Sequence, residues 1–566
     1  MKHKDTFEQF KLLVRTFFDD FVTPVSEEEE DDERTSLLPY VLGALVGPGA
    51  FFCFYELPRY ADIRIKLAPM SQQGATIEAK FFLITFTIVA VGFFMAWRWD
   101  SLFVEEREYL VLGPLPVHPG VVFAAKFVAL LLAVAAIATC VNVVPCLMFP
   151  ALAAVGGVSA PASYFVHVFT IAAAALFTMA FFLCAEVVLL NVLPYRLVRR
   201  LSPIVQIATS GVLAFMLLMA VDSSAAVAQV HRADTPVLRA LPPFWFVGLY
   251  QQLLGHGDRL WTAMALRAQY GLALVVALSA VMLAITYARH MRQVLEAKPG
   301  GTSSRAPLAM IARTVSRWIT RTPEQQGGCE FVLLTLLRSH KHRLVFASFM
   351  ALALAFSLQG GVIAVAGLGR LDNPAIGVLS APLVLSFFTM LGMLWAMTMP
   401  TGGRARWVFE IAAEGRRADV VAGARRAFLA VAIGVPTLAA VPLFFSKFAS
   451  GRAATYLLTT SLLVGLASCA AARLVRTIPF IRTEQRFRPP QLSLVLFAAW
   501  FAFTMYSYFM ARLELWVDTS ATALAVFSAV VVAVAAYALL KPVEYEDPVP
   551  DWWRREEGLL LVEVHT

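Results

Sequence analysis

Long apolar runs separated by short polar segments dominate the chain. They form two sets of six, near 37–57, 81–97, 121–152, 164–190, 203–222 and 266–287, and then near 344–367, 375–399, 427–446, 454–472, 492–511 and 518–540. Each is close to the roughly 20 residues that a helix needs to cross a bilayer. Lipid offers backbone groups no partner, so such runs must be helical, whereas the strands of a barrel would alternate. The pattern predicts an all-α polytopic membrane protein with about 12 transmembrane helices in two parallel six-helix repeats.

Polar stretches divide the chain further. Residues 1–36 combine a segment whose apolar residues recur at helical spacing, opposite Lys11 and Arg15, with an acidic run. They predict a cytoplasmic amphipathic helix in the membrane interface, then an acidic linker, with no cleaved signal peptide. The remaining parts are a first six-helix half at 37–290, a basic cytoplasmic linker at 291–328, a second amphipathic helix and six-helix half at 329–540, and a cytoplasmic tail at 541–566.

Composition and charge narrow the class of protein. The 566 residues are 59% hydrophobic and 15% charged, too apolar for a soluble chain. With the amino terminus inside, 34 Lys and Arg fall in cytoplasmic segments and 11 in outer loops, which favours cytoplasmic termini and a multi-pass protein of the cell membrane. The net charge of +8 is therefore explained by the Lys and Arg residues that set the orientation of the chain in the membrane. Nucleic-acid binding is not needed to explain it. One loop disagrees, because 58–80 is predicted outside and carries Arg59, Arg64, Lys66 and Lys80.

A charged segment between the second and third runs, Trp97–Lys126, is too rich in features for a simple connector. It holds a carboxylate cluster, an apolar face and a proline that stops a helix, formed by Glu105, Glu106, Glu108, Tyr109, Leu110, Leu112 and Pro114. The pattern is typical of a short amphipathic helix on a membrane surface. An interfacial anchor is the alternative. Anchoring does not require three carboxylates before an apolar patch, and such a patch needs something to bury it.

The second half has a corresponding segment at Leu394–Ala430. Trp395 occupies the place of Trp97, and Arg426 that of Lys126. Its loop is basic where the first is acidic, and its candidate contact residues are Phe409, Glu410, Glu414, Arg416 and Arg417.

These two segments resemble the permease subunits of ABC transporters of the type-2 exporter family. In that family the first cytoplasmic loop carries a coupling helix that docks on the ATPase, and an elbow helix precedes the first span. The resemblance implies two permease halves fused in one chain, with the two segments as ATPase-coupling loops. It also implies that ATP and Mg belong to separate nucleotide-binding subunits and that this chain binds no cofactor. A short apolar segment at 241–257, before the sixth run, matches the family's re-entrant helices and equally fits an aromatic belt.

Few polar residues interrupt the runs. Glu186 and Gln206 are the candidates for a transport path, because a carboxylate inside a span normally faces a cavity or a partner. Glu186 also lies near the expected cytoplasmic end of its span, where it can reach the interface. The six cysteines show no disulfide or metal spacing, and the chain has no phosphate-binding loop, zinc motif or serine nucleophile elbow. We therefore expect a transport subunit and no enzyme; a secondary transporter driven by an ion gradient and a membrane scaffold are the alternatives.

Overall fold

The computed structural model describes residues 2–22, 38–67, 72, 74–99, 117–155, 157–193, 195–221, 227, 239–296, 306–358, 376–399, 416–480, 503, 505–506, 509–517 and 520–540. The chain divides into two compact units, Met1–Gly300 and Gly301–Thr566. The division falls inside the predicted linker. Each unit is described by itself.

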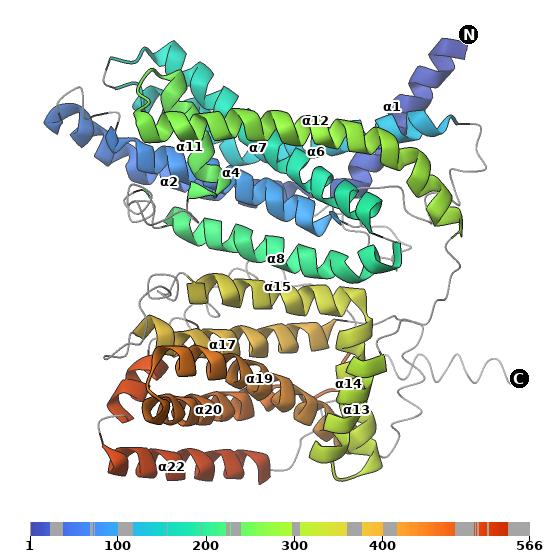
Figure 1. The fold of residues 1–566 in the computed structure, drawn as a ribbon, viewed down its shortest axis with the longest axis vertical. Helices are drawn as coiled ribbons and strands as arrows, with labels where there is room; N and C mark the ends of the chain where they lie inside the picture. Colours follow the sequence, from blue (N-terminus) through green and yellow to red (C-terminus); the bar gives the residue numbers. More distant parts are fainter. Residues whose placement is uncertain are drawn as a thin grey trace, which may run out of the picture. The chain divides into compact units, whose positions relative to one another are not determined.

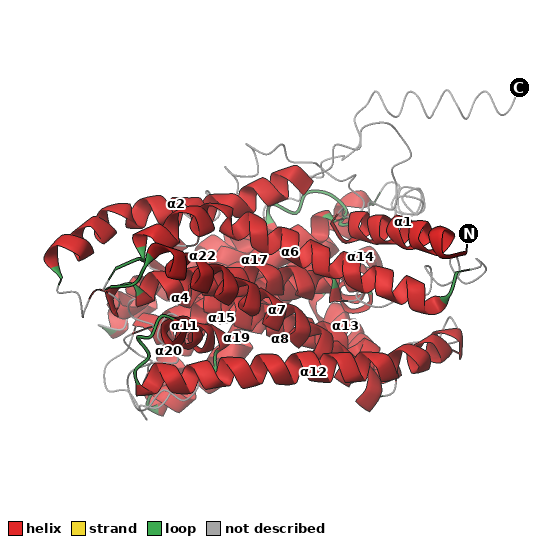
Figure 2. Cartoon of the chain, turned by 90° about the horizontal axis from the view of Figure 1, so that it is seen from above, coloured by secondary structure: helices red, strands yellow, loops and turns green. Residues whose placement is uncertain are grey.

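The described residues form helices joined by short connections, and no strand occurs among them (Figures 1 and 2). The helices of unit 1 are α1 (Lys2–Val22), α2 (Leu38–Lys66), α4 (Ile77–Trp97), α6 (Pro119–Leu152), α7 (Ala160–Val192), α8 (Tyr195–Val221), α11 (Pro242–Leu253) and α12 (Arg259–Glu296). Those of unit 2 are α13 (Ala306–Ile319), α14 (Pro323–Arg338), α15 (His340–Ser357), α17 (Ile376–Thr398), α19 (Arg417–Lys447), α20 (Ser450–Ala472) and α22 (Ala521–Leu540).

Seven stretches among the described helices are long and apolar enough to cross a membrane. They are Ile77–Trp97, Gly120–Leu152, Ala160–Val192, Arg259–Met282, Ile376–Thr398, Arg417–Lys447 and Ser450–Ala472, with shorter apolar helices at Val205–Ala220, His342–Ser357 and Thr522–Val534. Length and composition thus make the chain an all-α membrane protein. The count of twelve spans stays a prediction.

The loop predicted after the first span is partly helical, because α2 continues beyond the apolar run to Lys66. Ion pairs stabilise this extension. Arg59 Nη1 lies 3.4 Å from Glu56 Oε2 and its Nη2 lies 2.5 Å from Glu78 Oε2 at the start of α4. Lys66 Nζ lies 2.9 Å from Asp62 Oδ2 one turn earlier. Two of the four cations that disagreed with the predicted topology, Arg59 and Lys66, are therefore paired with local carboxylates.

Unit 1 is built around α4, which packs against α6, α7, α8 and α11. Most of its side chains are buried on all faces, as expected for a helix without a polar stripe. Gly92 of α4 allows close approach to α8, because a Cβ there would lie 2.6 Å from Leu213 Cδ2. α12 has 38 residues and lies against α7 and α11.

Unit 2 is built around α17 and α19, with α15 against α17, α20 against α19, and α22 against α20. Figure 1 shows α13 and α14 lying across the ends of the longer helices of this unit. α14 packs against α19 at two glycines, since a Cβ at Gly328 would lie 2.3 Å from Val420 O, and one at Gly423 would lie 2.0 Å from Gln325 O.

The predicted linker at 291–328 contains more regular structure than its composition indicated. α12 extends into it as far as Glu296, and α13 lies within it. Apolar residues at helical spacing in Ala306–Ile319 bury Ala312 against the rest of the unit and leave Arg313 and Arg317 exposed. The Arg and Ser content had indicated a linker, but the apolar spacing within it specifies an amphipathic helix.

Candidate functional site

The predicted coupling residues of the first loop, Glu105 to Pro114, lie outside the described residues, and so do Phe409, Glu410 and Glu414 of the second loop. Arg416 and Arg417 are described, at the start of α19. The structure also describes the helices that lead into and out of both loops, α4 and α6 in unit 1 and α17 and α19 in unit 2.

The first loop is flanked on both sides by contacts to α1. Arg98, at the end of α4, donates from Nε to Phe21 O at 2.8 Å and from Nη2 to Asp20 O at 2.7 Å. Cations favour the carbonyls at the end of a helix, where the helix dipole is negative. On α6, Lys126 Nζ lies 5.4 Å from the centre of the Phe17 ring and 6.0 Å from that of Phe21. α1 is therefore attached to both helices that border the first loop.

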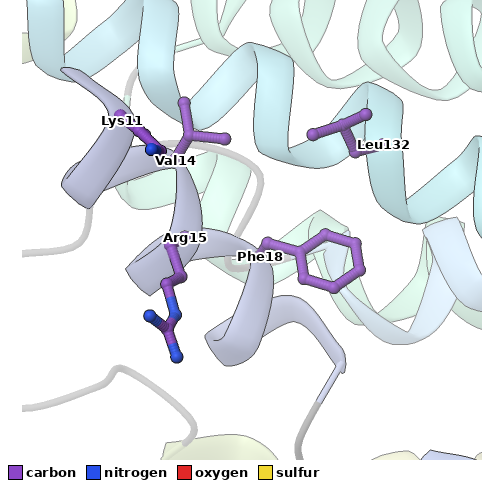
Figure 3. Close-up of a pocket in the computed structure, with 5 residues that line it drawn as sticks. All are labelled: Lys11, Val14, Arg15, Phe18 and Leu132. Atoms are coloured by element: carbon purple, nitrogen blue, oxygen red, sulfur yellow. The ribbon is translucent and has the colours of Figure 1, made fainter. Parts of the chain in front are cut away.

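α1 packs against α6, and an open groove lies between the two helices. Lys11, Val14, Arg15 and Phe18 of α1 line it together with Leu132 of α6. Figure 3 shows Val14 pointing toward α6 and Arg15 pointing away from it. The lining surface is mostly apolar, with the two cations at its rim, as expected for an amphipathic helix in a membrane interface.

The second loop is flanked by contacts to α13 and α14. Arg416 forms an ion pair with Glu324 near the start of α14. The pKa of Glu324 lies below its usual value, chiefly through a hydrogen bond to its own backbone N–H and then through Arg416. Gln325 Nε2 donates to Asp419 Oδ1 at 3.0 Å, and Arg426 Nη1 donates to Ile319 O at the end of α13 at 3.0 Å. Arg416 thus contacts α14 as well as bordering the loop.

The other border of the second loop, the end of α17, is also attached. His342 Nε2 donates to Met399 O at 3.0 Å, because a carbonyl oxygen can only accept. In the neutral ring Nδ1 then accepts from the Ser339 hydroxyl at 2.7 Å. The backbone N–H of Phe480 donates to Met397 O at 2.9 Å. These bonds connect the end of α17 to α15 and to the segment after α20.

Lys126 and Arg426 make comparable contacts. The sequence paired them as corresponding positions on the helices after the two loops. In the structure each side chain reaches from α6 or α19 to an amphipathic helix, Lys126 to aromatic rings of α1 and Arg426 to the last carbonyl of α13.

Glu186 and Gln206 are both buried in unit 1, on α7 and α8. These two helices pack against α4 more extensively than against each other. The structure therefore places the two candidates within one unit, on different helices.

A buried polar cluster that the sequence analysis did not single out lies between α4, α7 and α11. Lys80, counted as an outer-loop cation, is fully buried on α4. Its Nζ donates to Gln251 Oε1 at 3.0 Å and lies 4.8 Å from the centre of the Tyr250 ring. The Tyr250 ring in turn lies 5.9 Å from that of His167 on α7. The available signal was the spacing of Ser163, His167 and Thr170, which places three polar residues on one face of α7.

Unit 2 contains buried polar contacts of its own. Glu514 is fully buried and accepts a hydrogen bond from Thr460 Oγ1 at 2.7 Å. Tyr506 and Ser386 of α17 share a hydroxyl–hydroxyl bond of 2.7 Å. Both contacts join segments that are far apart in the sequence. Burying a polar group costs free energy unless it is hydrogen-bonded, so these two bonds reduce the cost of packing the segments together.

No known protein family, curated protein or solved structure matches the chain. The fold itself defines the class, an all-α membrane protein with two helical units.

Proposed function

We propose that the chain is the membrane-spanning permease component of an ABC-type exporter, with two permease halves in one polypeptide. A separate nucleotide-binding subunit hydrolyses ATP and docks on the loops that contain Glu105–Pro114 and Phe409–Arg417. When the ATPase subunits close on ATP, the docked loops transmit this movement to the two permease halves of the chain. The termini and both loops are cytoplasmic in this proposal.

The observation that carries the proposal is the attachment of an amphipathic helix beside each loop. In unit 1, Arg98 and Lys126 connect both borders of the loop to α1. In unit 2, Arg416 and Arg426 connect one border to α14 and α13. A loop that transmits force must be attached at its ends, since otherwise movement of the partner would bend the loop and leave the helices in place. A mere interfacial anchor has no such requirement.

The relations between helices support a repeat of the two halves. In each unit the helix after the loop packs against an amphipathic helix, as α6 does with α1 and α19 with α14. The helix before the loop packs against the helix after it, and the last helix packs against the fourth, as α12 does with α7 and α22 with α20. Parallel repeats of this kind are a common basis of transporters.

A secondary transporter is the second candidate, and Lys80 favours it. A fully buried ionisable side chain in a membrane helix is costly and often belongs to an ion path. The purified chain in liposomes tests this candidate directly. A flux of protons or sodium down an imposed gradient, measured with an ion-sensitive dye and without any ATPase, would replace the favoured proposal.

The test of the favoured proposal is capture of the ATPase. Burying an apolar side chain contributes roughly 1.5 to 3 kcal/mol, whereas an exposed ion pair contributes about 0 to 1 kcal/mol. Changing Tyr109 and Leu110 together to Ser should therefore release the ATPase, and Glu105→Gln should weaken its capture only modestly.

The matched control for capture is the double change of Met310 and Ile311 to Ser on α13. Like Tyr109 and Leu110, these two residues are adjacent and apolar in the sequence. The structure shows that Met310 and Ile311 are exposed. The control should retain the ATPase at equal membrane expression. If the Tyr109 and Leu110 variant recovers as much ATPase as the control, the first loop is only an interfacial anchor.

A further inference from the structure

The polar cluster of unit 1 contains side chains from three helices at one enclosed place. Its members are Lys80 of α4, Ser163, His167 and Thr170 of α7, and Tyr250 of α11, and none is more than 1% exposed. Ser163 and Thr170 lie about one turn on either side of His167, and the His167 ring contacts Tyr250.

Four members of the cluster have polar atoms without a well-formed hydrogen bond within the described part of the chain. They are Ser163 Oγ, Thr170 Oγ1, Tyr250 OH and both ring nitrogens of His167. The side chains of Ser163 and Tyr250 are near enough to interact with each other. Buried polar groups are nearly always bonded, so Thr170 and His167, side by side on one face of α7, need an explanation.

Other hydroxyls of the same unit show what is usual. Thr85, Thr87 and Thr178 each donate to the carbonyl four residues earlier in their own helix, at 2.6, 2.9 and 2.9 Å. Ser163 and Thr170 do not use this ordinary solution. Their hydroxyls are available to donate to another group.

The chemistry of these groups is that of an anion site. Ammonium and hydroxyl groups donate hydrogen bonds, and a neutral imidazole donates one more. The two contacts of Lys80 described above, to Gln251 and Tyr250, are to neutral groups.

α11 closes the cluster. This helix has 12 residues, too few to span a bilayer, and it contributes Tyr250 and Gln251. Gly248 of α11 lies so close to α12 that a Cβ would be 2.5 Å from Trp261 O. Gly255, at φ +76°, ends the helix in the left-handed conformation that favours glycine. α11 and α12 are thus a close-packed hairpin, and α11 separates the cluster from the outside of the unit only through its contacts with α4 and α7.

We propose that this cluster binds one anionic group, a carboxylate or a phosphate, when α11 withdraws. Lys80 of α4 supplies the charge, and Ser163, His167 and Thr170 of α7, which remain in place, supply hydrogen bonds to the anionic oxygens. The ligand is either a free inorganic anion or the head of a larger apolar molecule. The site does not depend on an ATPase, so it stands or falls separately from the proposed function.

The experiment measures thermal unfolding of the purified full-length chain in detergent, by tryptophan fluorescence, at constant ionic strength. The probes are inorganic phosphate, octyl phosphate, octanoate and the uncharged octanol. Binding to the folded state raises the unfolding temperature by an amount that grows with the logarithm of one plus the ratio of the free ligand concentration to Kd, so the shift yields the Kd. An anion-specific rise is expected, with octanol giving none. A response to inorganic phosphate identifies a free anion as ligand, and a response only to octyl phosphate or octanoate identifies an amphiphile.

Two variants and a control assign the response to the cluster. Lys80→Met should abolish it, and Thr170→Val, of similar side-chain volume, should raise the half-saturating concentration about tenfold. Lys66→Met, which removes an exposed cation, should leave it unchanged. If Lys80→Met does not fold, Thr170→Val decides. The proposal is overturned by the absence of any anion response, by an equal response to octanol, or by an unchanged response in Thr170→Val.

Discussion

Gly328 and Gly327 are adjacent on α14, yet a methyl group added at each should have opposite effects. A Cβ at Gly328 would lie 2.3 Å from the backbone oxygen of Val420 on α19, whereas a Cβ at Gly327 meets nothing within 4 Å. Because the obstacle is backbone, no side-chain rotation relieves the overlap, and Gly328→Ala must push α14 away from α19.

The magnitude follows from two opposing terms. Alanine is favoured over glycine inside a helix by about 0.8 to 1 kcal/mol, which both variants gain. Overpacking costs about 1 to 3 kcal/mol and applies only at Gly328. The free energy of separating α14 from α19 should therefore be about 1 to 3 kcal/mol lower in Gly328→Ala than in Gly327→Ala.

The next residue, Cys329, provides the assay. Its side chain is fully buried, and burial, assisted by Glu330, raises the pKa of its thiol to about 11. Maleimide reacts with the thiolate, so labelling at pH 7.5 requires α14 to leave α19. With the other five cysteines replaced, Gly328→Ala should label about 5 to 140 times faster than Gly327→Ala. Equal labelling rates in the two variants would refute the packing of α14 on α19.

Three further predictions concern attachment, orientation and a buried carboxyl group. Arg98→Met removes two hydrogen bonds to the end of α1, worth about 1.5 to 3 kcal/mol each for a charged donor, so trypsin should cleave α1 faster, as followed by mass spectrometry. On a cysteine-free background, His256→Cys should react with an impermeant maleimide on intact cells and Thr314→Cys only after permeabilisation; the reverse pattern means that the orientation is inverted. Glu514→Gln keeps an acceptor for Thr460 and should unfold at an unchanged or higher temperature, whereas Glu514→Ala should lose about 1 to 3 kcal/mol; equal losses in the two variants would contradict the hydrogen bond.

Local patterns were sufficient to predict most helices and the amphipathic segment at the start of the chain. The spacing of Phe17 and Phe21 opposite Lys11 and Arg15 specified which face of α1 is buried, and the structure buries both aromatics. Apolar runs likewise predicted the helical class, because helix and burial here depend on neighbouring residues alone. The C-terminal end of α2 was missed because ion pairs extend the helix past the apolar run, to Lys66.

The polar cluster could not be found in the same way, because its bonds are long-range. Lys80 and Gln251 are 171 residues apart, and nothing near Lys80 in the sequence distinguishes a buried cation from a loop cation. The glycine contacts between α14 and α19 depend on an approach of two backbones that no periodicity encodes. Of the site residues that were predicted, Glu186 and Gln206 are buried, while the coupling residues before Arg416 remain predictions.

The length of α12 has a mechanical consequence. At a rise of 1.5 Å per residue its 38 residues extend about 57 Å, against about 30 Å of hydrocarbon in a bilayer. About 27 Å of rigid rod therefore projects beyond the membrane core, and with the orientation proposed above this includes the end nearest unit 2 in the sequence. The apolar stretch ends at Met282, so the residues from there to Glu296 account for about 21 Å of this projection, and a tilt of about 10° at the membrane surface moves their tip by about 4 Å. α12 can thus act as a lever. A small rotation inside the bilayer becomes a displacement of several ångströms for the segment that follows Glu296.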